Sequence, residues 1–84
     1  MLQNTNFIPL NGFVPNEETA MKIAEAVWLP IYGERILEEK PYNAFLQENE
    51  IWIIEGSLHS QKGGVAYIEI QKSDGKVLKV THGK

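Results

Sequence analysis

The sequence predicts an α+β fold: one N-terminal helix, with a short helical turn after it, packed on a curled four-stranded antiparallel meander sheet. Three observations support this prediction. Residues 64–82 alternate apolar and polar side chains on both sides of an Asp-Gly pair, which is typical of a β-hairpin. Residues 16–31 place apolar side chains at helical spacing. Residues 42–55 hold two more apolar runs joined by a short polar segment, and such short connections favour antiparallel neighbours.

Length and composition indicate a small globular protein. The chain has 84 residues, of which 43% are hydrophobic and 23% charged, and it has no cysteine, which excludes disulfides and thiolate zinc sites. No apolar run approaches the length of a membrane span, and the first six residues lack the basic start and apolar stretch of a signal peptide. We therefore expect a cytoplasmic protein without membrane contact; a periplasmic or surface location stays open if a signal was removed.

The chain divides into an N-terminal arm, residues 1–15, and a single α+β domain, residues 16–84. Between residues 7 and 14 the arm is rich in apolar side chains, but prolines and a glycine interrupt them, so no long element can form. We expect the arm to pack as a loop over one end of the core.

A helix is expected from Glu17 to Leu29. Asn16 is a favourable N-cap, and the carboxylates of Glu17 and Glu18 interact well with the helix dipole in the first turn. Pro30 disfavours helical geometry at the residue before it, so the helix is expected to end or kink at Leu29.

The region after the helix is expected to lead into the first two strands. Gly33 is a predicted left-handed stop, and residues 34–39 are expected to form one short helical turn. Strands are predicted at 42–46 and 51–55, with a polar turn at 47–50 between them. The second strand is nearly all apolar, as expected in the interior of a sheet.

The alternation in the C-terminal hairpin also predicts its register, because a slip of one residue would turn every side chain to the other face. A three-residue loop, 73–75, with its glycine left-handed, pairs Ile70 with Leu78 and Ile68 with Val80. A two-residue Asp-Gly loop would instead mix apolar and charged side chains on each face. We therefore predict the three-residue loop.

The same register places His82 on the apolar face, opposite Ala66. Trp28 and Trp52 are expected to anchor the core. The other predicted core side chains are Ile23, Val27, Ile54, Ile68, Ile70, Leu78 and Val80.

Charge is distributed unevenly along the chain. Residues 17–55 hold nine glutamates against three basic residues, a net charge of −6, whereas residues 72–84 hold four lysines against one aspartate, a net charge of +3. Because the overall net charge is −3, we do not expect nucleic acid as a direct partner. The glutamates form either a solvated face that keeps the protein soluble or a docking surface for a basic protein.

Residue types that carry catalysis or bind metals are few. The two histidines, His59 and His82, do not belong to a metal-spaced cluster, and no serine lies in a Gly-x-Ser-x-Gly elbow. Glu55 and Glu69 would form an acid/base pair only if they shared a face; exposed carboxylates on the sheet are the alternative. We therefore expect no enzymatic activity, no metal and no organic cofactor.

Several short segments share their order and spacing with a known protein family. They are residues 19–25, 31–36, 39–42, 51–56, 63–65, 67–70 and 74–78, with His82 near the end. From about Val14 to Lys84 the chain resembles the small bacterial immunity proteins with a nuclear-transport-factor-two-like (cystatin-like) cone fold, which are found beside polymorphic toxins. The resemblance implies a protein that binds and neutralises a cognate toxin, often a nuclease or another effector of competition between bacteria.

The shared motifs are structural, so the family transfers no site residue to this chain. The charge pattern supplies a candidate instead, because a toxin that cuts nucleic acid tends to be basic around its active site. The predicted partner-binding side chains are Glu34, Glu38, Glu39, Glu48 and Glu50.

Two alternatives stay open at this point, and so does the oligomeric state. Residues 20–24 and 68–78 are also similar to peptidase-propeptide domains, which are thought to inhibit proteases, but only these two pieces match. Cone folds also house isomerases and dehydratases with a carboxylate in an apolar pocket. One helix and a short turn leave little volume for such a pocket.

Overall fold

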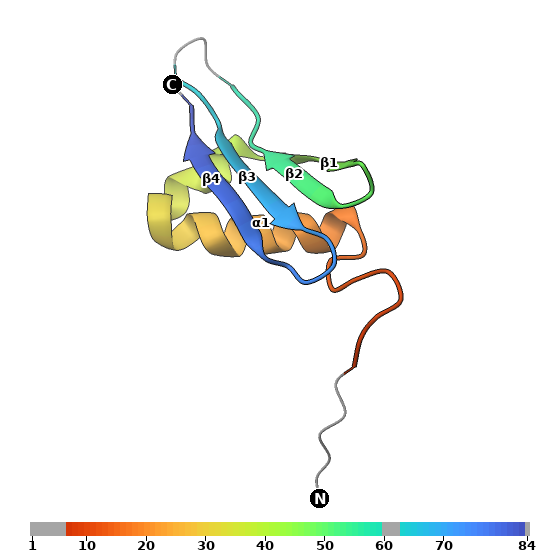
Figure 1. Cartoon of the computed structure of the whole chain (residues 1–84). Coiled ribbons are helices and arrows are strands. Elements are labelled where there is room, and N and C mark those ends of the chain that lie inside the picture. The colour runs from red at the N-terminus through yellow and green to blue at the C-terminus, as the bar shows by residue number, and fades with distance from the viewer. Residues whose placement is uncertain (1–6, 60–62, 84) are drawn as a thin grey trace, which may run out of the picture.

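Four antiparallel strands form one open sheet, and a single long helix lies across one of its faces (Figure 1). The computed structural model describes residues 7–59 and 63–83, so the first six residues of the predicted arm lie outside the described part. The strands pair in chain order, which confirms the predicted α+β meander. The elements are α1 (Glu17–Tyr32), η1 (Gly33–Glu39), β1 (Asn43–Gln47), β2 (Ile51–Glu55), β3 (Ala66–Gln71) and β4 (Val77–His82).

Helix α1 begins where the sequence predicts but passes the predicted end at Leu29. Its first turn is capped by the side chain of Asn16, which accepts a backbone hydrogen bond of 2.8 Å. Pro30 lies inside the helix and removes one donor, whose partner would be the carbonyl of Ala26. Ala26 is exposed, so water can satisfy that carbonyl and the helix continues. Gly33, with a φ of +78°, then ends α1 by donating to the carbonyl of Leu29, which confirms the predicted stop.

The 3-10 helix η1 leads from α1 to the sheet and takes the place of the predicted short turn. Strand β1 begins and ends one residue later than predicted, and β2 occupies the predicted residues. Between them the N–H of Glu50 donates to the carbonyl of Gln47 over 2.9 Å. Glu48 and Asn49 have positive φ values of 52° and 60°, as the central residues of tight hairpin turns often do.

Alternation along the strands divides the sheet into an inner face, covered by α1, and an outer face without a helix. One row across the inner face runs Ala44, Ile54, Ile68 and Val80, each paired with the next. Helix α1 packs mainly on β1, β2 and β3. The inner side chains of β2 and β3 are therefore fully buried in this row, whereas Val80 on β4 is half-buried.

The β3–β4 hairpin confirms one predicted pair and corrects the other. Ile68 lies opposite Val80 as predicted, but Ile70 pairs with Val77 in place of Leu78. The register shifts between these pairs, which leaves Leu78 as the extra residue of a β-bulge. The prediction that Leu78 belongs to the core is therefore wrong, and its side chain is 41% exposed.

The turn of this hairpin is wider than predicted, because residues 72–76 separate the two strands instead of three residues. Within the turn, the Asp74 carboxylate accepts a hydrogen bond of 2.9 Å from the backbone N–H of Lys76. Gly75 has the expected positive φ, +81°, and donates to the carbonyl of Gln71 over 2.8 Å.

The arm is attached to this turn through two of the turn's carbonyls. The N–H groups of Phe13 and Val14 donate to the carbonyls of Ser73 and Lys72 over 3.0 and 3.1 Å. The carbonyl of Val14 in turn accepts a hydrogen bond of 2.7 Å from the indole of Trp52. Residues 7–9 of the arm extend away from the body of the molecule (Figure 1).

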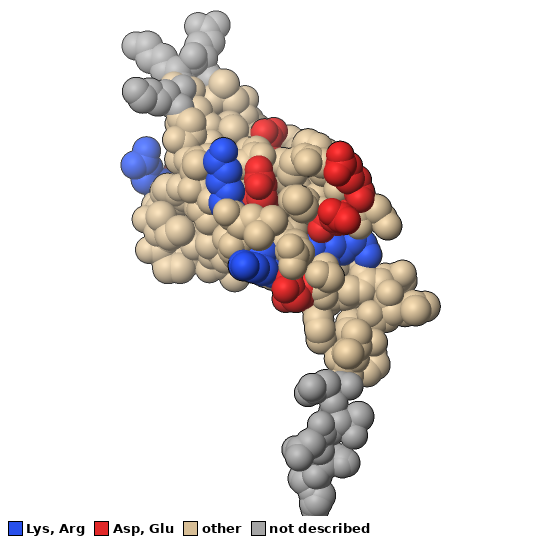
Figure 2. Space-filling view, viewed as in Figure 1, with Lys and Arg blue, Asp and Glu red and all other residues tan. Residues whose placement is uncertain are grey.

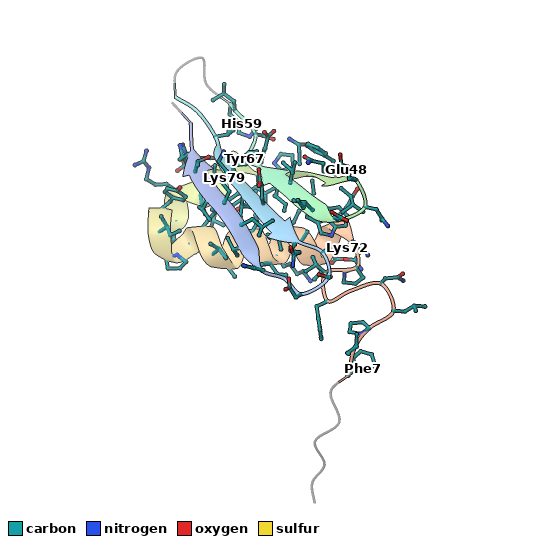
Figure 3. The ribbon with its side chains drawn as sticks, viewed as in Figure 1. Phe7, Glu48, His59, Tyr67, Lys72 and Lys79 are labelled. Atoms are coloured by element: carbon teal, nitrogen blue, oxygen red, sulfur yellow. The ribbon has the colours of Figure 1, made fainter. Side chains whose placement is uncertain are left out.

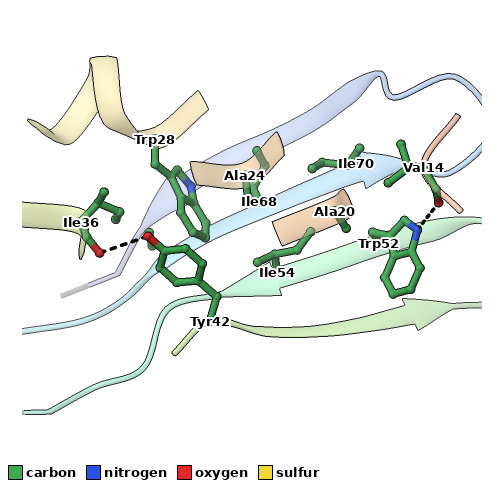
Figure 4. Close-up of a cluster of buried hydrophobic side chains, with 11 residues drawn as sticks. Val14, Ala20, Ala24, Trp28, Ile36, Tyr42, Trp52, Ile54, Ile68 and Ile70 are labelled. Atoms are coloured by element: carbon green, nitrogen blue, oxygen red, sulfur yellow. Dashed lines mark hydrogen bonds between the residues drawn. The ribbon is translucent and has the colours of Figure 1, made fainter. Parts of the chain in front are cut away.

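The core lies between α1 and the inner face of the sheet (Figure 4). Trp28 and Trp52 are both buried, as predicted, and Trp28 packs edge-on against Tyr42 with ring centroids 5.1 Å apart. Of the other predicted core residues, Ile23 and Val27 are half-buried against it. The fully buried side chains include Val14, Ala20, Ala24, Ile36, Ile54, Ile68 and Ile70.

Candidate functional site

The five glutamates predicted to bind a partner fall into two groups at opposite ends of β1. Glu34, Glu38 and Glu39 lie on η1, before the strand, and Glu48 and Glu50 lie in the turn after it. A strand of five residues spans roughly 15–17 Å. All of these side chains are exposed except that of Glu39, which is half-buried. The fold therefore places three of them together before β1 and the other two together after it, so the five do not form one surface.

Glu39 joins η1 to the ends of two strands. Its Oε1 accepts a hydrogen bond of 2.8 Å from the backbone N–H of Ala66, where β3 begins, and its Oε2 lies 2.8 Å from Nε2 of His82, where β4 ends. His82 lies opposite Ala66, as predicted, and its ring packs edge-on against Tyr32. We call these contacts the Glu39–His82 clasp.

The geometry of the clasp favours a protonated His82. Its Nδ1 lies 2.8 Å from the carbonyl oxygen of Gly83, and its Nε2 lies 2.8 Å from the Glu39 carboxylate. A carbonyl and a carboxylate only accept hydrogen bonds, so both ring nitrogens must donate, which requires the imidazolium form. Accordingly, the hydrogen bond to Glu39, followed by that to Gly83, raises the pKa of His82 above its ordinary value.

An open cleft of about 660 Å³ lies beside the clasp. Arg35 and Glu38 from η1 line it together with His82. Another lining residue, His59, donates from Nε2 to the carbonyl of Lys40 over 2.7 Å. Because both ring nitrogens of His82 are already donating, this residue has no free nitrogen with which to accept a proton from a bound molecule. The cleft therefore offers charge and shape, but His82 is not a ready general base in it.

The outer face of the sheet is the second candidate site, and it is turned toward the viewer in Figures 1–3. At its centre Ile53 is flanked by Phe45 on β1 and Glu69 on β3, and Glu69 pairs with Lys79 on β4. Ile53 is only 6% exposed although no helix covers it, whereas Phe45 is 54% exposed. The remaining members of the outer face are Asn43, Gln47, Ile51, Glu55, Tyr67, Gln71 and Thr81.

Three side chains of the outer face hold one another in place. The hydroxyl of Tyr67 donates to the Glu69 carboxylate over 2.6 Å, and the ammonium of Lys79 lies 5.8 Å from the centre of the Tyr67 ring. Figure 3 shows Tyr67 and Lys79 side by side on the two neighbouring strands. The hydrogen bond to Glu69 raises the pKa of Tyr67 to about 12, so the phenol stays protonated at neutral pH.

Glu55 and Glu69 do share the outer face, where they are diagonal neighbours on β2 and β3. Glu69 is engaged by the Tyr67 hydroxyl, and both carboxylates are half-buried on an open surface. Within residues 7–59 and 63–83, no three His, Asp or Glu side chains are grouped so that they could hold a metal ion. In the same ranges no helix is long and apolar enough to cross a membrane.

The members of the outer face were predictable from the sequence, but the Glu39–His82 contact was not. The alternation of β3 and β4 predicted which side chains share each face. Glu39 and His82 are 43 residues apart, and their contact depends on how η1 lies against the sheet. The only signal for it was the predicted placement of His82 opposite Ala66, on the side where α1 and η1 lie.

The sequence is similar to several known proteins. A family model described as NTF2 fold immunity protein matches residues 19–84. Two similar proteins of Escherichia coli (strain K12) are named uncharacterized protein YhhH, 38% identical over 78 residues, and uncharacterized protein YbbC, 40% identical over 74 residues. These matches cover 89% and 84% of this chain but 61% and 60% of the relatives, so the chain spans about three fifths of their length. No solved structure matches it. The extent of the family match shows that the chain belongs to the NTF2-fold immunity proteins.

Proposed function

We propose that this protein neutralises a cognate bacterial toxin by binding and covering it, without performing chemistry on it. The observation that carries the proposal is the family match over residues 19–84, which includes every element of the described fold except the first two residues of α1. An immunity protein must recognise one toxin, and occlusion of the toxin's active site is the simplest way for a small domain to do so.

The geometry of the Glu39–His82 clasp supports binding over catalysis. Both oxygens of Glu39 and both nitrogens of His82 are engaged by other groups of the chain. A general acid/base pair needs an atom within hydrogen-bond reach of its substrate. The two residues instead connect η1 to the ends of β3 and β4, so their role here is to hold the fold.

The exposed carboxylates at the two ends of β1 support a basic partner. Glu34, Glu38, Glu48 and Glu50 are all exposed, and the chain as a whole carries a net charge of −3. A toxin that acts on nucleic acid needs basic residues around its active site. Attraction between the two proteins would then speed their encounter, and the association rate would fall as salt rises.

Co-expression with the toxin domain encoded by the neighbouring gene tests the proposal. We expect growth to be rescued and the two proteins to co-purify. If neither occurs, the proposed immunity function is wrong. To separate occlusion from catalysis, Glu39→Gln and His82→Gln should still rescue growth when the variants are folded. Rescue that depends on these side chains in a folded protein would contradict the non-catalytic mechanism.

Charge reversal at the four exposed glutamates tests steering. The combined variant should associate severalfold more slowly at low salt and lose most of its salt dependence. It carries four substitutions: Glu34→Lys, Glu38→Lys, Glu48→Lys and Glu50→Lys. Glu39 is left unchanged because the clasp needs it. An association rate with the same salt dependence as the wild type would mean that these side chains do not face the toxin.

A further inference from the structure

The outer face has the composition of a protein interface, with an apolar centre and a polar rim. Phe45 is its largest exposed apolar side chain, and it lies directly opposite Ile53, which neighbouring side chains already cover. Cross-strand pairs of this kind bring side chains within about 5 Å of each other. Phe45 therefore lies beside a buried neighbour, and more than half of its own surface is still available to a partner.

The rim beside this centre is ordered before any partner arrives. Tyr67 is held by its hydrogen bond to Glu69, and Lys79 is held over the Tyr67 ring. Side chains fixed in advance lose less conformational entropy when a partner binds. The rim is thus prepared for contact on the β3 and β4 side of the face, while Phe45 is exposed on the β1 side.

The charge around this face is acidic in sum. Glu55 and Glu69 oppose Lys79 on the face itself, and the β1–β2 turn adds Glu48 and Glu50. Lys72, Asp74 and Lys76 in the β3–β4 turn bring the total to a net charge of −2. Figure 2 shows acidic and basic side chains interspersed over this side of the molecule. A partner that matches it presents an apolar groove with basic side chains beside it.

We propose that the toxin docks on the outer face, with Phe45 entering an apolar groove and basic toxin side chains meeting Glu55 and Glu69. This inference rests on the proposed immunity function and names the surface that performs it. Four strands at about 4.8 Å spacing and five or six residues long give a face of roughly 15–20 Å on each side. A standard interface buries about 800 Å² per partner, so the β1–β2 turn with Glu48 and Glu50 must take part as well.

Truncation of Phe45 is the direct test, and Ile31 on α1 is a matched control. The two side chains are apolar and equally exposed, at 54% and 56%, but Ile31 lies on the helix that covers the other side of the sheet. With the toxin domain from the neighbouring gene, purified in an inactivated form, Phe45→Ala should raise the Kd about tenfold or more, as for an interface hot spot. Ile31→Ala should change the Kd less than about twofold. Urea melts establish that both variants are folded.

Charge variants test the acidic part of the face independently. Glu55→Lys and Glu69→Lys together should lower the association rate severalfold at low salt, and the difference should shrink at high salt. Glu18→Lys on α1, which loses an exposed pair with Lys22 and a favourable interaction with the helix dipole, is the control and should leave the rate unchanged.

The results of these experiments distinguish an error in the proposed interface from an error in the proposed function. If the wild type rescues growth and binds the toxin while Phe45→Ala and the charge variants bind equally well, the outer face is not the interface and the immunity function stands. Equal losses for Phe45→Ala and Ile31→Ala also overturn the inference. If sedimentation shows a dimer that Phe45→Ala dissociates while toxin binding is unchanged, a second copy of this chain occupies the face instead. If the wild type neither rescues nor binds, the proposed function itself fails.

Discussion

Strands β3 and β4 are arms of one hairpin and have six residues each, yet their burial is opposite. Along β3, buried and half-buried residues alternate without a break, whereas on β4 only Val80 is not exposed. Both strands alternate apolar and polar side chains in the sequence for most of their length. The alternation therefore indicates which face a side chain belongs to, but it does not indicate whether anything covers that face.

The position of each strand in the sheet explains the difference. Strand β3 is paired on both edges and α1 packs on it, while β4 is the last strand and lies beyond the region that α1 mainly covers. A bulge at Leu78 also takes this residue out of the predicted pair. Edge strands often carry lysines that hinder pairing with other chains, and Lys79 in β4 fits this description.

The largest effect is expected at the buried strand. Ile68→Ala on β3 removes a side chain that is 0% exposed at the centre of the core, and it should lower the free energy of unfolding by about 2–5 kcal/mol. Urea denaturation of the wild type and the variant measures the difference. A loss below about 0.5 kcal/mol, the range of surface substitutions, would mean that α1 does not cover this face.

The order of the elements and the faces of the sheet are predictable from the sequence because they depend on local periodicity. The α1 cap at Asn16, the stop at Gly33 and the Ile68–Val80 pair all follow from short-range patterns. The bulge at Leu78 does not follow from such a pattern, and the turn beside it also makes contacts with the arm, which is distant in the sequence.

A second test of the hairpin concerns the contact between the arm and the β3–β4 turn. Gly12 has a φ of +83°, and a Cβ built on it would lie 2.5 Å from the carbonyl oxygen of Lys72. Gly12→Ala should therefore strain the backbone and separate the arm from the turn, at a cost of about 1–3 kcal/mol in urea melts. Gly63→Ala is the control, because Gly63 has a similar φ of +88° but no atom of residues 7–59 or 63–83 lies within 4 Å of the added Cβ. Equal losses in the two variants would show that the contact with Lys72 contributes nothing.

A smaller effect is expected at the exposed strand. Leu78→Ala on β4 should lower the free energy of unfolding by less than about 1 kcal/mol, because the side chain is 41% exposed and lies outside the packed core. The same urea melts used for Ile68→Ala provide the comparison. A loss as large as that of Ile68→Ala would mean that Leu78 packs in the core opposite Ile70, as the sequence predicts. The two strands would then not differ in burial.

The candidate site was predictable to a different degree in each of its parts. The outer face follows from alternation, and the register places Phe45, Ile53 and Glu69 in one row. Which of these side chains stays exposed does not follow, because Phe45 and Ile53 are both apolar and only the packing around them distinguishes them. The separation of the predicted glutamates was itself predictable, because the strand expected at 42–46 already lies between the two groups.

The smallest effect is expected at the clasp, which fixes the far end of β4. Because the pKa of His82 is raised in the folded protein, the stability that it adds is fully present below its ordinary pKa of about 6.5 and is lost as the pH rises through the folded-state value. The free energy of unfolding should thus fall as the pH rises above about 6.5, by less than about 1 kcal/mol for a partly exposed pair. Arg35 acts against this shift, since its charge lowers the pKa of His82. In His82→Gln this part of the pH dependence should disappear; if the variant keeps the full slope of the wild type in urea melts, the imidazolium does not hold β4 to Glu39.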